Sequence, residues 1–145
     1  KQIRKLAAEK LALVGLKDIE DLYPSQLSGG MRKRVSLARA ISYNPQIILY
    51  DEPTSGLDPV TSAMIDNLIL KLRDNLGVTS IVVTHDLESA FNIADRIAMI
   101  HKGVIYAIGT PQEIKNHPDP VVQQFINRRP EGPITEELMK EIQKR

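Results

Sequence analysis

Residues 47–52, Ile-Ile-Leu-Tyr-Asp-Glu, decide the fold, because an apolar run without alternation ends there on two adjacent carboxylates. Such a run is typical of a strand buried on both faces, as in a parallel sheet. A second apolar run follows at 81–84. Between the two, Asp58 is a helix N-cap before Pro59, and the pattern predicts a helix over 59–76. Strand, helix and strand in this order predict a βαβ unit with a right-handed crossover.

Helices and a hairpin surround this unit. Apolar residues at helical spacing predict helices over 3–14 and 28–43. Downstream, Lys102-Gly103 between two apolar runs is a two-residue hairpin signal. The remaining predicted elements are a helix at 87–94, strands at 97–101 and 104–108, and helices at 111–116, 121–127 and 135–144. The fold class is therefore α/β, with parallel strands, flanking helices, a small hairpin and a C-terminal helical tail.

Composition excludes several classes of function. An apolar fraction of 42% in 145 residues is enough for a folded core. The net charge of +1 gives no support to a nucleic-acid-coating protein or a polybasic membrane binder, so no nucleic-acid partner is expected. Because the chain has no cysteine, disulfides, thiolate zinc sites and cysteine nucleophiles are excluded. No apolar run approaches the ~20 residues of a membrane span.

Two carboxylates and a histidine are expected at one edge of the sheet. Asp51 and Glu52 end the first strand, where open α/β sheets place ligands, and extended geometry would point their side chains to opposite faces. The two carboxylates repel each other, and a divalent cation such as Mg²⁺ would remove that cost. His85 ends the second strand and should reach the same edge. The group indicates phosphoryl chemistry, and the plainer alternatives are a solvated strand end and a capping histidine.

Ser28-Gly29-Gly30 comes immediately before a predicted helix. A hydroxyl, two glycines that allow close approach and the positive end of a helix dipole can together bind an anion such as a phosphate. The alternative is a flexible helix N-cap without a ligand.

The order and spacing of residues 27–31, 50–59 and 84–86 resemble the C-terminal half of an ABC-transporter ATPase. The resemblance implies a P-loop NTPase fold and an enzyme that hydrolyses ATP with Mg²⁺. It implies that Asp51 anchors Mg²⁺ through water, that Glu52 is the general base, and that His85 contacts the γ-phosphate. It also implies that a second ATPase subunit, in a head-to-tail dimer, holds the ATP over which the signature motif closes. The residues given nucleotide contacts by this analogy are Ser28, Gly29 and Gly30, with Asp58 linking the two sites.

The same resemblance implies three segments and a location. Residues 1–44 would end the helical subdomain and carry the signature helix, 45–117 would form the α/β core and hairpin, and 118–145 the helical tail. The partners would be transmembrane permease subunits, with the ATPase peripheral on the cytoplasmic face of the inner membrane.

A narrower resemblance points to the Mla and Mce type of lipid-transport ATPase, also linked to toluene tolerance. It is carried by 29–35, by Tyr50 and by the tail at 122–125 and 132–134. This resemblance implies that the cargo is a lipid or another hydrophobic compound. Met31 stands where the common signature motif has Gln.

A P-loop of the form Gly-x-x-x-x-Gly-Lys-Ser/Thr does not occur in the chain. We therefore expect the chain to be the C-terminal part of a longer ATPase, inactive alone, rather than a protein that has lost nucleotide binding. The strand at 81–84 would then keep an unpaired apolar edge, and we expect the chain to self-associate.

Two other functions stay open. One is an ABC-type ATPase of DNA repair or translation, without a transporter. The other is a non-catalytic interaction module, in which the apolar side of the tail docks on a partner; that side carries Ile134, Leu138, Met139 and Ile142.

Overall fold

The computed structural model describes residues 2–143. Within them the chain forms two compact units, the first ending at Ile93 and the second beginning at Ala94. The three segments predicted from the motifs are divided after residues 44 and 117. They are defined by function and not by packing, so they stay a prediction.

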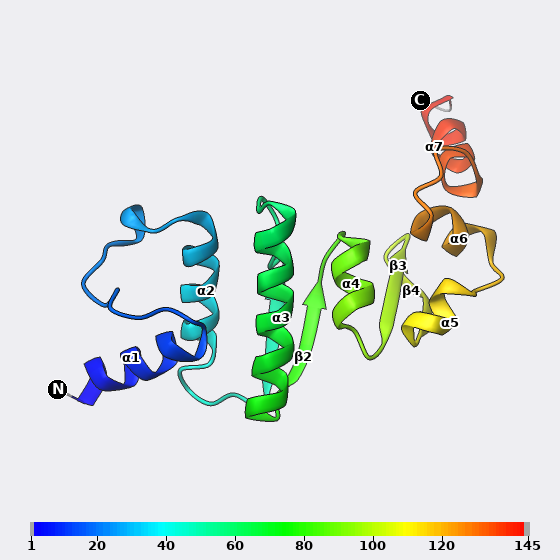
Figure 1. Ribbon diagram of the computed structural model, residues 1–145. Helices are drawn as coiled ribbons and strands as arrows, with labels where there is room; N and C mark the ends of the chain where they lie inside the picture. The colour runs from blue at the N-terminus through cyan, green and yellow to red at the C-terminus, as the bar shows by residue number, and fades with distance from the viewer. Residues whose placement is uncertain (1, 144–145) are drawn as a thin grey trace. The chain divides into compact units, whose positions relative to one another are not determined.

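The first unit contains the predicted βαβ arrangement (Figure 1). Strands β1 (Ile47–Asp51) and β2 (Thr79–Val83) pair in parallel, with Leu49 opposite Ile81 and Asp51 opposite Val83. Helix α3 (Pro59–Leu76) connects them. The parallel register brings the C-terminal ends of both strands to one edge of the sheet, which is where the predicted site residues follow in sequence.

Capping residues set the bounds of α3, as the sequence predicts. The Asp58 carboxylate accepts hydrogen bonds from the backbone N–H groups of Val60 and Thr61, both at 3.0 Å. At the other end Gly77 adopts the left-handed conformation, with φ of 63°, and its N–H bonds to the carbonyl of Arg73. Glycine meets no steric penalty in this conformation, so the helix ends there.

Three further helices and one short turn complete the first unit. They are α1 (Gln2–Leu13), the 3₁₀ turn η1 (Pro24–Gln26), α2 (Gly29–Ala40) and α4 (Leu87–Ile93). Helix α2 ends three residues earlier than predicted. The chain turns at Asn44, which has φ of 50°, and Lys10 of α1 donates to the Asn44 side chain at 2.6 Å.

The prediction that both strands are buried on both faces is wrong for the described residues. Ile48 and Tyr50 are each only 4% exposed and pack with Ile65 and Leu72 of α3 in the core. On the opposite face Leu49 is 74% exposed, and Ile47, Ile81 and Val83 are also exposed. The helices of this unit bury one face of the sheet, so the apolar residues of the other face lie open.

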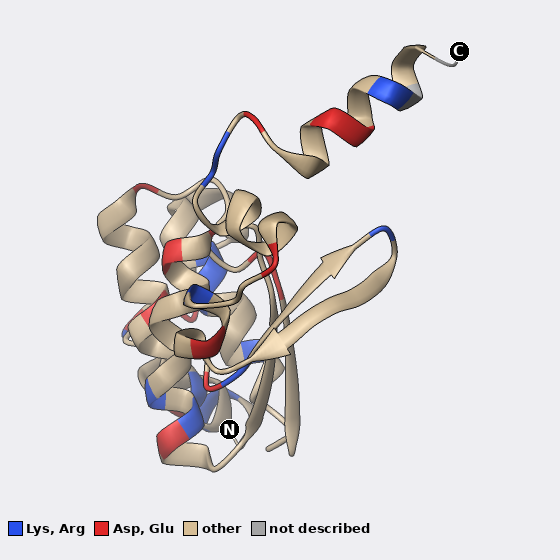
Figure 2. Ribbon diagram, turned by 90° about the vertical axis from the view of Figure 1, so that its right-hand side faces the viewer, with Lys and Arg blue, Asp and Glu red and all other residues tan. Residues whose placement is uncertain are grey.

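The second unit begins with the predicted hairpin. Strands β3 (Ile97–His101) and β4 (Val104–Gly109) pair antiparallel, and the turn residues Lys102 and Gly103 both have positive φ, as a type I′ turn requires. Figure 2 shows this hairpin without charged residues except at its turn. A bulge interrupts the ladder between Met99 and Ile100.

The tail forms three short helices, α5 (Pro111–Lys115), α6 (Pro120–Ile126) and α7 (Pro133–Gln143). The predicted end of the last helix at residue 144 lies outside the described residues. The buried Gln124 holds the segment between α6 and α7, because its side chain accepts from the Ile134 N–H at 2.7 Å and donates to Thr135 at 3.2 Å. Among the described residues, no helix is both long and apolar enough to cross a membrane.

Candidate functional site

Glu52 and His85 contact each other at the C-terminal edge of the sheet. The Nδ1 atom of His85 lies 2.8 Å from Oε1 of Glu52, and the backbone N–H of His85 donates to the same oxygen at 3.1 Å. The hydrogen bond and the charge of Glu52, with a smaller effect of Asp86, raise the pKa of His85. The carboxylate therefore favours the protonated imidazole, and the two side chains form one electrostatic unit.

Glu52 does not continue the strand. Its φ is 46°, so the extended geometry on which opposite directions of the Asp51 and Glu52 side chains depended ends at Asp51. The Glu52 N–H still donates to the Val83 carbonyl at 2.9 Å, which keeps the turn attached to β2. A left-handed residue that is not glycine is uncommon, and such residues gather at functional sites.

The hydrogen bonds with His85 use only one of the two carboxylate oxygens of Glu52. Oε2 is buried and has no hydrogen-bond partner within the described part of the chain. A buried polar atom without a partner is costly, so this atom is a candidate to hold a water or a ligand. Tyr50 Oη and Ser80 Oγ are two further buried oxygens in this sheet, and burial raises the pKa of Tyr50.

Asp51 is the last residue of β1, and its side chain is exposed. Among residues 2–143 no cluster of three or more histidine or acidic side chains could hold a metal ion by itself. Mg²⁺ in phosphoryl-transfer sites is commonly bound by one or two carboxylates, with substrate phosphates and waters as the other ligands. The exposed carboxylate of Asp51 fits that pattern, so Asp51 could hold Mg²⁺ together with a nucleotide.

Ser28 and the two glycines begin α2. Ser28 is its N-cap, with the hydroxyl accepting from the Met31 N–H at 3.2 Å. A Cβ on Gly30 would lie 2.9 Å from Cγ2 of Thr61, so glycine allows the start of α2 to approach the start of α3 closely. The Met31 side chain, which replaces the usual Gln, packs against the hydrophobic core. Ser28 is therefore a helix N-cap. The first backbone N–H groups of a helix have no partner within the helix, so those of α2 can donate to an anion.

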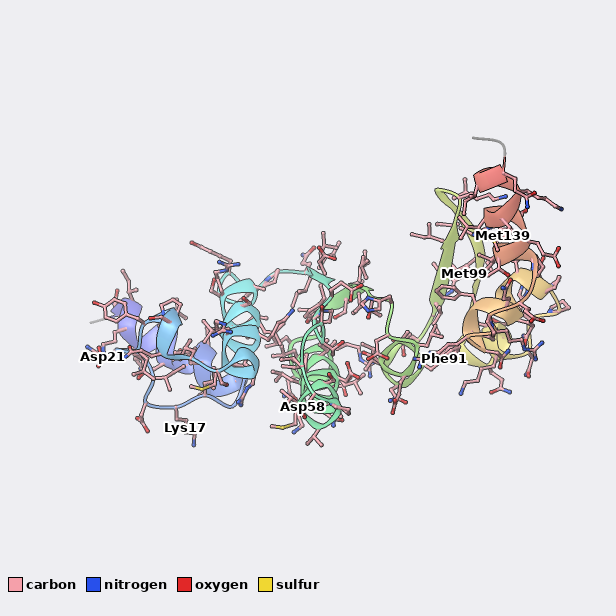
Figure 3. The ribbon with its side chains drawn as sticks, turned by 90° about the horizontal axis from the view of Figure 1, so that it is seen from above. Lys17, Asp21, Asp58, Phe91, Met99 and Met139 are labelled. Carbon is pink, nitrogen blue, oxygen red and sulfur yellow. The ribbon has the colours of Figure 1, made fainter. Side chains whose placement is uncertain are left out.

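Asp58 begins α3 (Figure 3), and its hydrogen-bond partner Thr61 is the residue that approaches Gly30 of α2. The Asp58 carboxylate caps α3 and accepts from the Thr61 hydroxyl at 2.5 Å, and these hydrogen bonds lower its pKa. The predicted residues thus form two groups. Asp51, Glu52 and His85 gather at the sheet edge, and Ser28, Gly29, Gly30 and Asp58 gather where α2 and α3 begin.

Two contacts were missed by reasoning from the sequence. Lys33 of α2 donates to the Glu52 carbonyl at 2.9 Å, and no pattern in the sequence signals a contact between residues nineteen positions apart. Ser89 of α4 donates to Asp66 of α3 at 2.5 Å. Asp66 directly follows Ile65 on the apolar side of a predicted helix, and that placement of an acid was the available signal.

Comparison with known proteins finds similarity to ATP-binding cassettes of ABC transporters. Residues 2–55 match the family model described as ABC transporter. The structure of MJ1267 in its ADP conformation, an ATP-binding cassette of an ABC transporter, matches with a TM-score of 0.76 and 28% identity over 86% of this chain and 50% of that one. The dimeric bacterial cassette MJ0796 matches with a TM-score of 0.66 and 39% identity, covering 76% and 47%. The chain has the P-loop NTPase fold of ABC cassettes, and its residues 2–55 are similar to the ABC transporter family.

Curated relatives are named as ATP-binding proteins of transport systems, with different cargo in their names. The chain is 44% identical over 133 residues to the probable ribonucleotide transport ATP-binding protein mkl of Mycobacterium tuberculosis, covering 92% of the chain and 37% of that protein. It is 38% identical to the methionine import ATP-binding protein MetN 1 of Bacillus cereus, covering 99% and 42%. The chain thus spans less than half the length of these relatives.

Proposed function

We propose that this chain supplies the water-activating and signature parts of an ATPase subunit that powers an ABC transporter. The observation that carries the proposal is the Glu52–His85 pair at the sheet edge, with one Glu52 oxygen left without a partner. The named transport functions of the relatives support a transporter over an ATPase of DNA repair or translation.

Glu52 is the general base in this proposal. Its Oε1 atom is engaged by His85, and Oε2 is the oxygen left to accept a hydrogen bond from the attacking water. His85 orients the Glu52 carboxylate and would donate to the γ-phosphate. Positioning and charge stabilisation account for most of the catalysis in phosphoryl transfer, so two fixed side chains at this edge suffice for these roles.

Asp51 is the residue that would hold Mg²⁺, through a water molecule. Bound there, the ion would neutralise charge on the phosphates of ATP. The exposed position of Asp51 next to Glu52 supports this role.

The signature group is proposed to act on a second subunit. Ser28, Gly29 and Gly30 at the start of α2 would contact the γ-phosphate of ATP bound by the other subunit of a head-to-tail dimer, and Asp58 would link the two sites. The dimeric MJ0796 cassette supports the existence of a second subunit. The proximity of Gly30 to Thr61, which hydrogen-bonds Asp58, supports a joint action of the two helix starts.

The proposal also includes the transported molecule and the membrane partners. Transmembrane permease subunits would bind this ATPase at the cytoplasmic face of the inner membrane and select the cargo. We propose a lipid or another hydrophobic compound, supported by the similarity of residues 29–35 and of the tail to the Mla and Mce type. Purification of the whole subunit with its permease, followed by identification of the bound lipid, tests this part.

The chain has no P-loop sequence, and in this proposal another segment of the whole subunit grips the phosphates. We expect the 145 residues alone to hydrolyse no ATP and to bind it too weakly to saturate at millimolar concentration. Tight, Mg²⁺-dependent binding by calorimetry would contradict this expectation.

The decisive experiment replaces the base in the whole subunit. Glu52→Gln keeps the size of the side chain but removes its charge and replaces one acceptor oxygen with an NH2 donor, and it should bind ATP while turnover is nearly abolished. Glu136→Gln, an exposed glutamate of α7, is the matched control and should hydrolyse ATP at the wild-type rate. Wild-type turnover in Glu52→Gln would refute the assignment of the base.

A second candidate function rests on α7. Glu137 attaches this helix to the hairpin through Lys102, at 2.6 Å, while Leu138, Met139 and Ile142 are exposed. This apolar surface favours docking of the tail on a partner or on the second subunit. Deletion of the residues after Arg129 should then weaken dimerisation of the whole subunit, and unchanged dimerisation would rule the docking function out.

A further inference from the structure

Helix α2 contacts the turn that carries Glu52 through one side chain. The Lys33 ammonium donates to the backbone carbonyl of Glu52 at 2.9 Å, in a partly buried position. Lys33 lies in the second turn of the helix that Ser28 caps. One helix therefore contacts the candidate base at one point and begins at the candidate phosphate contacts.

The backbone of Glu52 needs such support. Its φ of 46° lies in the left-handed region, which a residue with a side chain adopts only where surrounding contacts hold it. Three hydrogen bonds do so: the Glu52 N–H donates to Val83, and its carbonyl accepts from Lys33 and from the Ser55 N–H at 3.2 Å. Among these three, Lys33 alone contributes a side chain, and its charge makes that bond the stronger kind.

We propose that Lys33 is a positioning residue that fixes the Glu52 backbone, and with it the direction of the Glu52 carboxylate toward His85. The inference rests on the proposed role of Glu52. Nucleotide contact at the N-terminal, signature end of α2 would displace this end of the helix. Because α2 is one helix, the displacement would be transmitted through Lys33 to Glu52 of the same subunit. In a head-to-tail dimer, the signature end and the base of one subunit serve different ATP sites, so Lys33 would connect the two sites.

The first test detects the effect of Lys33 on Glu52 in the absence of ATP. Titration of the His85 ring by NMR in this chain reports the position of Glu52, because Glu52 raises the pKa of His85. Loss of the Lys33 charge alone would raise that pKa further, since a nearby cation disfavours protonation. Displacement of the Glu52 carboxylate away from His85 would lower the pKa of His85. The two explanations therefore predict shifts of opposite sign.

Lys33→Met should lower the pKa of His85 toward its ordinary value and speed hydrogen exchange at the His85 amide, which donates to Glu52. Lys33→Arg should restore both, because a guanidinium can donate to the same carbonyl. Arg39→Met removes a positive charge from an exposed position on the same helix and should change neither. A His85 pKa that stays or rises in Lys33→Met would overturn the proposal.

The second test is kinetic and uses the whole subunit. Lys33→Met should lower kcat for ATP by about tenfold to a hundredfold with an unchanged KM, as expected when a catalytic group is misplaced by a fraction of an ångström to an ångström. Lys33→Arg should recover most of the rate. Wild-type kcat in Lys33→Met overturns the positioning role. If Glu52→Gln retains turnover instead, Glu52 is not the general base. The NMR titration of His85 would still decide whether Lys33 positions Glu52.

Discussion

Ser89 donates a hydrogen bond to Asp66 across 2.5 Å, and both side chains are almost completely buried. The bond joins α3 to the first turn of α4, immediately after His85 and Asp86. Asp86 also caps α4, because its carboxylate accepts from the Glu88 N–H at 3.0 Å. The segment that carries His85 is thus anchored on its C-terminal side by a buried carboxylate.

This carboxylate predicts an unusual pH dependence of stability. Burial raises the pKa of Asp66, Ser89 opposes the shift, and the charges of Asp86 and Glu88 add to it. The folded state therefore holds a proton that the unfolded state releases at lower pH, so the free energy of unfolding should fall as pH rises from the ordinary carboxyl pKa through the raised one. Urea unfolding across this window should show the fall, and Asp66→Asn should flatten it.

The control for this prediction is Asp74→Asn, an exposed acid on the same helix, which should leave the pH dependence as it is. Ser89→Ala should destabilise the chain by about 1–3 kcal/mol above the window, because it leaves a buried charged acceptor without its donor. A pH profile in Asp66→Asn that matches the wild type would show that Asp66 is not the titrating group.

The contact between Glu52 and His85 should be visible in solution. We expect Glu52→Gln to lower the pKa of His85, because the hydrogen bond to a charged carboxylate is the largest cause of its rise. Since the folded-state pKa is raised, the contact favours folding below the ordinary histidine pKa, and this contribution is lost as pH rises through the raised value. NMR titration of the histidine ring measures the shift, with Glu136→Gln as the control. An unshifted His85 in Glu52→Gln would mean that the two side chains are apart in solution.

Two neighbouring glycines should respond differently to alanine. A Cβ at position 30 would lie 2.9 Å from Thr61, which is too close, whereas a Cβ at position 29 would make an ordinary contact with Leu57 at 3.6 Å. Gly30→Ala should therefore cost about 1–3 kcal/mol of stability through overpacking, and Gly29→Ala much less. Thermal unfolding of the two variants of this chain measures the difference, and equal costs would contradict the close approach of α2 to α3.

The open face and edge of the sheet should drive self-association of this chain. Leu49, Ile81 and Val83 form an exposed apolar surface on strands that, within the described residues, pair only with each other. Unpaired apolar strands invite pairing with another chain. Light scattering at tens of micromolar should give a mass above that of a monomer. Ile81→Lys should lower it, whereas Tyr43→Lys, at an exposed site outside the sheet, should not. A monomeric mass for the unchanged chain would refute the prediction.

Local signals in the sequence account for most of the elements. Asp58, Pro59 and Gly77 predicted both ends of α3, and Lys102-Gly103 predicted the hairpin turn, because caps and turns depend on residues close in the chain. The burial of the strands was mispredicted. An apolar run reports hydrophobicity, and whether another layer covers each face depends on the rest of the fold.

The sequence by itself determined the βαβ order and the arrival of Asp51, Glu52 and His85 at one edge, because parallel strands fix which residues end together. Only the tertiary structure decided how those residues are held. The left-handed Glu52, the Lys33 bond to its carbonyl and the buried pair of Asp66 and Ser89 all join segments far apart in the chain. Such contacts exist only once helices and strands have packed, and no local pattern of residue types encodes them.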